Sequence, residues 1–143
     1  MNAPIWHDAP PAELRPSENG GAALLRIITA PSLTAALRAL PHAFSVRLLH
    51  LGADKAAPLL ANGATKQTAL PFCRDVFLCL DNTPVVWARS QCSPNSAFWR
   101  GILDCGTRPL GEMLFGGGIA GLHRSPLQYA RPAPAAVAQA PTA

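Results

Sequence analysis

The sequence predicts one domain of the α+β class, in which a small antiparallel β-sheet packs against short helices. Two observations lead to this prediction. Residues 73–90, CRDVFLCLDNTPVVWARS, contain the β-branched and bulky apolar residues of two strands on either side of a turn sequence. In other segments the apolar residues recur with the 3.6-residue period of a helix.

Before the hairpin, the chain contains segments typical of helix and of strand. Residues 22–28 favour a short helix. Ser32 is a favourable N-cap for a second helix, whose apolar residues recur at helical spacing until Pro41 ends it. Residues 44–51 alternate between apolar and polar side chains, which predicts a strand that ends at Gly52.

In the hairpin the return strand is predicted to begin at Val85, after the turn residues. Beyond it, Ser96 is predicted to cap a helix over residues 97–104. The predicted buried face of that helix consists of Phe98, Ile102 and Cys105. Pro109, placed at the first helical position, predicts a last short helix through Phe115. Residues 123–131 are a candidate for a final short strand.

Arg74 is the polar residue of the hairpin that most needs an explanation. The two-residue period of a strand places Arg74 on the same face as the apolar residues Val76, Leu78 and Leu80. A guanidinium buried there without a partner would be strongly destabilising. Two interpretations stay open from the hairpin alone. Arg74 either lies at the strand end and reaches water or a nearby acid, or it binds an anionic ligand.

The composition argues against several classes of function. Hydrophobic residues make up 49% of the chain and charged residues 14%, and the basic residues behind the net charge of +4 form no Lys/Arg run. This distribution favours small anionic ligands over nucleic acid. No apolar segment approaches the length of a membrane span, and the N-terminus lacks the basic start and apolar core of a secretory signal. We therefore expect a cytoplasmic protein without membrane insertion.

The four cysteines, Cys73, Cys79, Cys92 and Cys105, are expected to be reduced thiols. None forms a CxxC pair and no histidine lies at ligand spacing, so no zinc site is predicted. Cys73 and Cys79 would lie about 20 Å apart on one strand, too far to be bridged together. The histidines are isolated and the few acids form no general acid–base pair, so spacing alone identifies no catalytic residue.

Four stretches resemble, in order and at nearly the same spacing, the chorismate pyruvate-lyase family, also called chorismate lyase or 4-hydroxybenzoate synthase. They are Ser32-Leu33-Thr34 at a helix start, FSVRLL in the next strand, the hairpin of residues 73–90, and LDCGTRPLGEMLF. The hairpin resembles the family's Arg-acid-aliphatic opening with a returning Ala/Gly-Arg-Ser/Thr. The last stretch resembles Leu-Gly-x-x-Pro-Leu-Gly-x-x-Leu-Phe and is fairly specific. Together they cover roughly residues 24–131, and the chain looks short at its C-terminus beside the family.

The resemblance implies an enzyme that eliminates pyruvate from chorismate to give 4-hydroxybenzoate for ubiquinone biosynthesis. It implies a buried ligand pocket beside the sheet, with no metal or cofactor. The implied product contacts are Arg74, which opens the hairpin motif, Leu110 of Pro-Leu-Gly, and Leu33 after the helix-opening serine. The family also uses a glutamate on a late strand, which has no counterpart here because no glutamate follows Glu112. We expect a monomer that acts on this small molecule.

Two alternatives belong to other functional classes. One is a non-catalytic domain of the same fold that binds small ligands, as in the effector-binding domains of some transcription regulators. The other is an inactive, truncated relative of the lyase. Conversion of chorismate to its products by the purified protein would separate both from the enzyme.

The predicted organisation has three parts. Residues 1–21, which contain several prolines and end in Gly20-Gly21, form a loosely ordered lead-in. Residues 22–131 form the lyase-like domain. Residues 132–143, a Pro/Ala sequence of low complexity, form a disordered tail.

Overall fold

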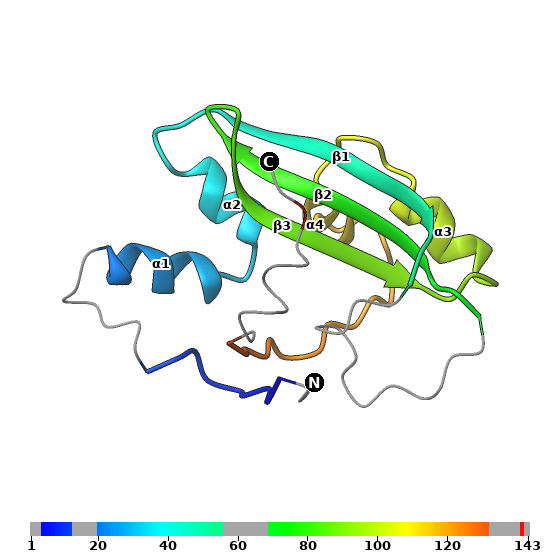
Figure 1. Ribbon diagram of the computed structural model, residues 1–143, viewed down its shortest axis with the longest axis horizontal. Helices are drawn as coiled ribbons and strands as arrows, with labels where there is room; N and C mark the ends of the chain where they lie inside the picture. Colours follow the sequence, from blue (N-terminus) through cyan, green and yellow to red (C-terminus); the bar gives the residue numbers. More distant parts are fainter. Residues whose placement is uncertain (1–3, 13–19, 56–68, 132–140, 142–143) are drawn as a thin grey trace.

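A computed structural model describes residues 4–12, 20–55, 69–131 and 141 of the chain (Figure 1). Its sheet has three antiparallel strands in the order β1 (Phe44–Ala53), β2 (Phe72–Leu80) and β3 (Thr83–Cys92). Short helices accompany the sheet, so the predicted α+β class is confirmed. Parts of the predicted lead-in and nearly all of the predicted tail lie outside the described residues, and the three-part organisation stays a prediction.

Four short helices appear in the described residues: α1 (Gly21–Ile28), α2 (Leu33–Arg38), α3 (Ala97–Leu103) and α4 (Leu110–Phe115). None of them has the length and apolar character needed to cross a membrane.

Both serines predicted to cap helices do so. The side chain of Ser32 accepts a hydrogen bond from the backbone N–H of Ala35 at 3.1 Å, and that of Ser96 accepts one from Trp99 at 3.2 Å. Each bond satisfies a backbone donor that has no partner within its own helix.

The turn between β2 and β3 is built from two residues in the left-handed region. Asp81 and Asn82 have φ of 49° and 64°, the conformation of the two-residue turns that match strand twist. The carboxylate of Asp81 accepts a hydrogen bond from the backbone N–H of Ala43 at 2.8 Å and lies 2.6 Å from His42 Nδ1. These contacts lower the pKa of Asp81 and attach the turn to the start of β1.

The strand boundaries differ from the prediction in two places. Gly52 does not end β1, because it pairs with Cys73 and the strand continues to Ala53. The return strand begins at Thr83 rather than Val85, and it includes Pro84. Pro84 is tolerated because β3 lies at the edge of the sheet and the register shifts at this point.

The buried face of α3 differs from the predicted one, which included Phe98 and left out Leu103. Phe98 is 61% exposed, whereas Leu103, four residues after Trp99, is 4% exposed. The helix is only seven residues long, and its contacts with β2 and β3 select the face that carries Leu103. Pro109 is the N-cap of α4 rather than its first residue.

The candidate strand over residues 123–131 is also absent from the described structure. This segment, which contains Pro126, makes only an isolated antiparallel bridge, in which Tyr129 and His7 each donate a backbone hydrogen bond of 2.8 Å to the other. Proline has no N–H to donate to a ladder, which disfavours a longer strand.

The core lies where α2 packs on one face of the sheet. Leu37 of α2 forms a buried cluster with Val76 and Leu78 of β2, and each of the three is at most 7% exposed. Because β2 is the central strand, seven consecutive residues from Cys73 to Cys79 are buried, on both faces of the sheet. The sheet face that carries Val76 and Leu78 is called the cavity face below.

Candidate functional site

A cavity of about 250 Å³ lies between the cavity face of the sheet and helices α2 and α4. Residues of β1, β2 and β3 form one wall, and residues in or beside the two helices form the rest. The apolar lining residues are Pro31, Leu33, Val46, Val76, Leu78, Ala88, Pro109, Leu110, Gly111, Leu114 and Phe115. The polar lining residues are Ser32, Thr34, Arg74, Ser90 and Arg124.

The three residues predicted from the family resemblance all line this cavity. Arg74 comes from β2, Leu33 from the first position of α2, and Leu110 from the first position of α4. Segments far apart in the sequence therefore meet here, through the packing of α2 and α4 beside the sheet. An apolar cavity with a few convergent polar groups is the usual form of a small-molecule site.

Arg74 is 3% exposed and is held by backbone carbonyls. Its Nη2 donates hydrogen bonds to the carbonyl oxygens of Gly106 and Arg108 at 2.9 and 3.0 Å. Its Nε is buried and has no hydrogen-bond partner among the described residues. The side chain therefore neither reaches water nor pairs with a described acid, in contrast to the first of the two sequence interpretations.

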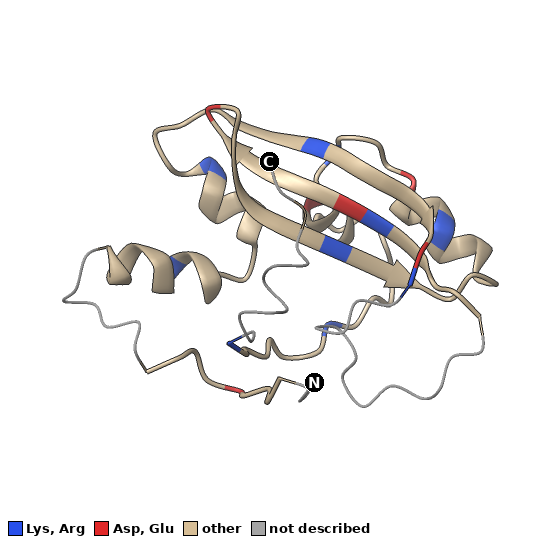
Figure 2. Ribbon diagram, viewed as in Figure 1, with Lys and Arg blue, Asp and Glu red and all other residues tan. Residues whose placement is uncertain are grey.

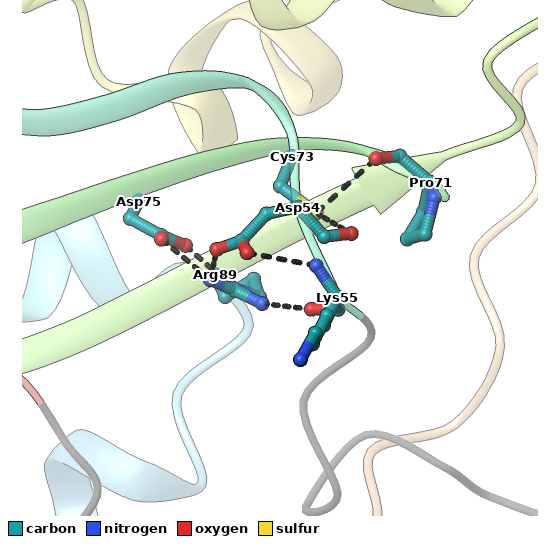
Figure 3. Close-up of polar contacts among 6 residues, drawn as sticks. All are labelled: Asp54, Lys55, Pro71, Cys73, Asp75 and Arg89. Atoms are coloured by element: carbon teal, nitrogen blue, oxygen red, sulfur yellow. Dashed lines mark hydrogen bonds and ion pairs between the residues drawn. The ribbon is translucent and has the colours of Figure 1, made fainter.

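The opposite face of the same hairpin carries a bidentate ion pair. Arg89 donates from Nε and Nη2 to the two carboxylate oxygens of Asp75, both at 2.7 Å, with side chains 9% and 7% exposed (Figure 3). Figure 2 shows acidic and basic segments side by side in β2 and a basic segment on neighbouring β3. Asp75 and Arg89 are also direct cross-strand partners.

This ion pair extends to the segment after β1. Arg89 Nη2 donates to Asp54 at 2.7 Å, and Arg89 Nη1 donates to the carbonyl of Lys55 at 2.7 Å (Figure 3). The backbone N–H of Lys55, followed by the Arg89 guanidinium, lowers the pKa of Asp54, whereas the bond to Asp75 chiefly raises the pKa of Arg89. We name Asp54, Asp75 and Arg89 the sheet-end cluster.

Cys73 lies beside this cluster and is 0% exposed. Its Sγ lies 3.7 Å from the carbonyl oxygen of Pro71 and 4.0 Å from that of Asp54 (Figure 3). Burial raises the pKa of this thiol. All four cysteines of the chain carry free thiols. In the described parts of the chain, no group of three or more His, Cys, Asp or Glu side chains is placed to hold a metal ion.

Sequence reasoning missed the other polar residues of the cavity. Thr34 and Ser90 each belong to a motif of the resemblance, but neither was assigned a role. Thr34 is 6% exposed, and Ser90 is the cross-strand partner of Arg74. Arg124 was not predicted as a cavity residue, because no local spacing indicates that it folds back against Pro31 and Phe115.

Comparisons with known proteins bear on this site. No protein-family model matches the chain. A protein of Albidiferax ferrireducens named probable chorismate pyruvate-lyase is 39% identical over 102 residues, which cover 69% of this chain and 51% of that protein. Proteins of the same name from a Shewanella species and from Ralstonia nicotianae are 41% identical over 86 residues and 39% identical over 89 residues. These two matches each cover 59% of this chain, and 44% and 45% of the respective relatives.

The chain thus spans about half the length of the curated relatives it matches. The motifs on which the resemblance was based lie within the described structure, and the residues they predict meet at one cavity. The similarity to proteins named probable chorismate pyruvate-lyase extends over 59–69% of the chain, and it confirms the family resemblance that the motifs predict.

Proposed function

We propose that the chain is a chorismate pyruvate-lyase, which binds chorismate in the cavity and eliminates pyruvate to leave 4-hydroxybenzoate. The observation that carries this proposal is the buried Arg74 in an otherwise largely apolar cavity, beside Leu33 and Leu110. The names of the curated relatives support the same reaction. The proposed role of the product is as a precursor of ubiquinone, with the reaction taking place in the cytoplasm.

Arg74 is suited to bind the carboxylate on the ring of chorismate. Its hydrogen bonds to the carbonyls of Gly106 and Arg108 both come from Nη2, and its buried Nε has no partner among the residues that the structure describes. A carboxylate oxygen would supply that partner, and the planar guanidinium favours such a contact over a point charge. Leu33 and Leu110 would then lie against the faces or edges of the ring.

The proposed reaction breaks the bond between a ring carbon and the oxygen of the enolpyruvyl group. A proton leaves the neighbouring, hydroxyl-bearing ring carbon to water, and its electron pair completes the aromatic ring. The released enolate takes a proton from water and becomes pyruvate. Aromatisation supplies the driving force, so the contribution of the protein is to hold chorismate in the reactive geometry in a desolvated cavity.

The residues that line the cavity are suited to bind and position chorismate rather than to transfer a proton. None of the described residues that line the cavity carries a carboxylate. The proposal therefore assigns no general base to the chain and assigns binding and positioning to Arg74, Leu33 and Leu110. We propose that the protein acts as a monomer and needs no cofactor for this reaction.

The direct test is to incubate the purified protein with chorismate and to measure 4-hydroxybenzoate and pyruvate over time. The proposal expects both products in equal amounts, at a rate well above that of chorismate alone. A matched sample of Arg74→Ala should lose most of this rate. Binding of 4-hydroxybenzoate without release of pyruvate would favour the non-catalytic ligand-binding domain, and the absence of both would overturn the proposal.

A further inference from the structure

Arg124 is the second arginine of the cavity, and it comes from a different wall than Arg74. Arg74 projects from the central strand, whereas Arg124 belongs to the segment that follows α4. Its Nη1 donates a hydrogen bond to the carbonyl of Pro31, and its guanidinium lies 4.4 Å from the centre of the Phe115 ring. The side chain of Arg124 is exposed, and these contacts hold it against the residue before the N-cap of α2 and against the last residue of α4.

The positive charges of the cavity have no acidic counterpart among the described lining residues. Among the residues that the structure describes, Arg74 contacts two backbone carbonyls, and Arg124 contacts one carbonyl and one aromatic ring. Neither kind of partner neutralises a guanidinium. Two guanidinium groups around one mostly apolar cavity match a small molecule with two separated anionic groups.

We infer that Arg124 is a second carboxylate-binding residue, which recognises the enolpyruvyl carboxylate of the substrate. The inference rests on the proposed function and specifies how the two carboxylates of chorismate are distributed. Arg74 is 3% exposed and would bind the ring carboxylate, which stays on the product. Arg124 is exposed and would bind the carboxylate of the group that leaves, from which pyruvate can pass to solvent.

Substitution of Arg124 should therefore affect the binding of substrate and of product differently from substitution of Arg74. Arg124→Gln should raise the KM for chorismate about tenfold to a hundredfold, because a charge-assisted contact is lost. It should leave the Kd for 4-hydroxybenzoate unchanged, because that product has no second carboxylate. Arg124→Lys should restore part of the chorismate affinity, because it keeps the charge without the planar fork. Arg26→Gln, at an exposed position of α1 outside the cavity, is the matched control.

Binding of a stable dicarboxylate separates this inference from the proposed function. 3-(Carboxymethoxy)-4-hydroxybenzoate carries both carboxylates and cannot eliminate pyruvate, so its affinity can be measured by calorimetry whether or not chorismate is converted. A lower affinity of Arg124→Gln for this dicarboxylate, with an unchanged affinity for 4-hydroxybenzoate, supports the inference. An equal loss of affinity for both ligands, or an unchanged affinity for the dicarboxylate, overturns it.

Failure of the wild-type protein to convert chorismate would instead count against the lyase activity. Circular dichroism of each variant checks the fold, and Arg124→Lys supplies the test if Arg124→Gln does not fold.

Discussion

Asp75 and Arg89 form a bidentate ion pair directly behind the proposed binding site. They are cross-strand partners in β2 and β3, and the next pair in the register, Arg74 with Ser90, lines the cavity on the other face. Successive residues of a strand point to opposite faces, so the two pairs lie back to back. The ion pair thus fixes the register of the two strands at the point where Arg74 enters the cavity.

The first prediction concerns the stability that this ion pair contributes. Asp75→Ala should lower the free energy of unfolding by about 3 kcal/mol, because it leaves the largely buried Arg89 without its bidentate partner. The loss should lie at the low end of the range for broken buried pairs, since Arg89 still contacts Asp54. Urea unfolding followed by circular dichroism measures the difference.

The matched control is the ion pair between Arg38 and Glu112, which joins α2 to α4 across a 2.7 Å contact. Both side chains are nearly half exposed, at 48% and 44%. Glu112→Ala should therefore change the free energy of unfolding by less than about 1 kcal/mol. Equal effects of Asp75→Ala and Glu112→Ala would show that the pair behind the cavity contributes no more than a surface contact.

The second prediction concerns stability at acidic pH. The pKa of Asp54 is lower in the folded protein, first through the backbone N–H of Lys55 and then through Arg89. A carboxyl group whose pKa is lower in the folded than in the unfolded protein stabilises the fold in its ionised form. This stabilisation is fully present above the ordinary carboxyl pKa of about 3.9, and it is lost as the pH falls through the lowered pKa. Wild type should therefore exceed Asp54→Asn in stability near neutral pH, and the difference should shrink in acid.

Urea unfolding of both proteins at about pH 7 and about pH 3 tests this linkage. Because Asp54 is partly exposed, the expected contribution is small, and the informative quantity is the change of the difference with pH. A difference that is equal at the two pH values would contradict the assignment of the lowered pKa to Asp54.

The third prediction concerns the accessibility of the thiols. Cys73 and Cys79 are 0% and 1% exposed, and burial also raises the pKa of Cys73. Since the thiolate is the reactive form, both should react slowly with iodoacetamide in the native protein, and Cys105, which is only partly buried, should react sooner. Mass spectrometry after timed alkylation identifies each site. In denaturant without reductant all four thiols should react, and a count of two would mean a disulfide.

The predictions that depended on local sequence were the most accurate. Ser32 and Ser96 cap the helices expected of them, and the hairpin turns at Asp81 and Asn82. These features depend on residues within a few positions of one another. The buried face of α3 was less predictable than its position, because packing against β2 and β3 decides that Leu103 is buried.

The candidate site was predictable only where a motif marked it. Arg74, Leu33 and Leu110 were identified by family resemblance, since nothing in their spacing brings them together. Arg89 and Asp75 could have been paired from strand alternation and the hairpin register. The place of Arg124 in the cavity could not have been predicted in this way, because it depends on the path of the chain after α4.

The fourth prediction concerns the volume of the cavity. Leu110→Trp should place a larger side chain in a space of about 250 Å³ and should strongly weaken the binding of 4-hydroxybenzoate. Leu24→Trp is the control, because Leu24 is 44% exposed on α1 and outside the cavity lining. Calorimetric titration of both variants measures the effect. Equal affinity in the two variants would place the ligand elsewhere.

The central claim is that Arg74 binds a carboxylate inside this cavity, and calorimetry with 4-hydroxybenzoate tests it most directly. A charge-assisted hydrogen bond contributes about 1.5–3 kcal/mol, so Arg74→Ala should raise the Kd by roughly one to two decades. Arg74→Lys should recover only part of the affinity, because the planar fork is lost. Arg26→Ala should behave as wild type. An unchanged Kd in Arg74→Ala, with an unaltered circular dichroism spectrum, would contradict the claim.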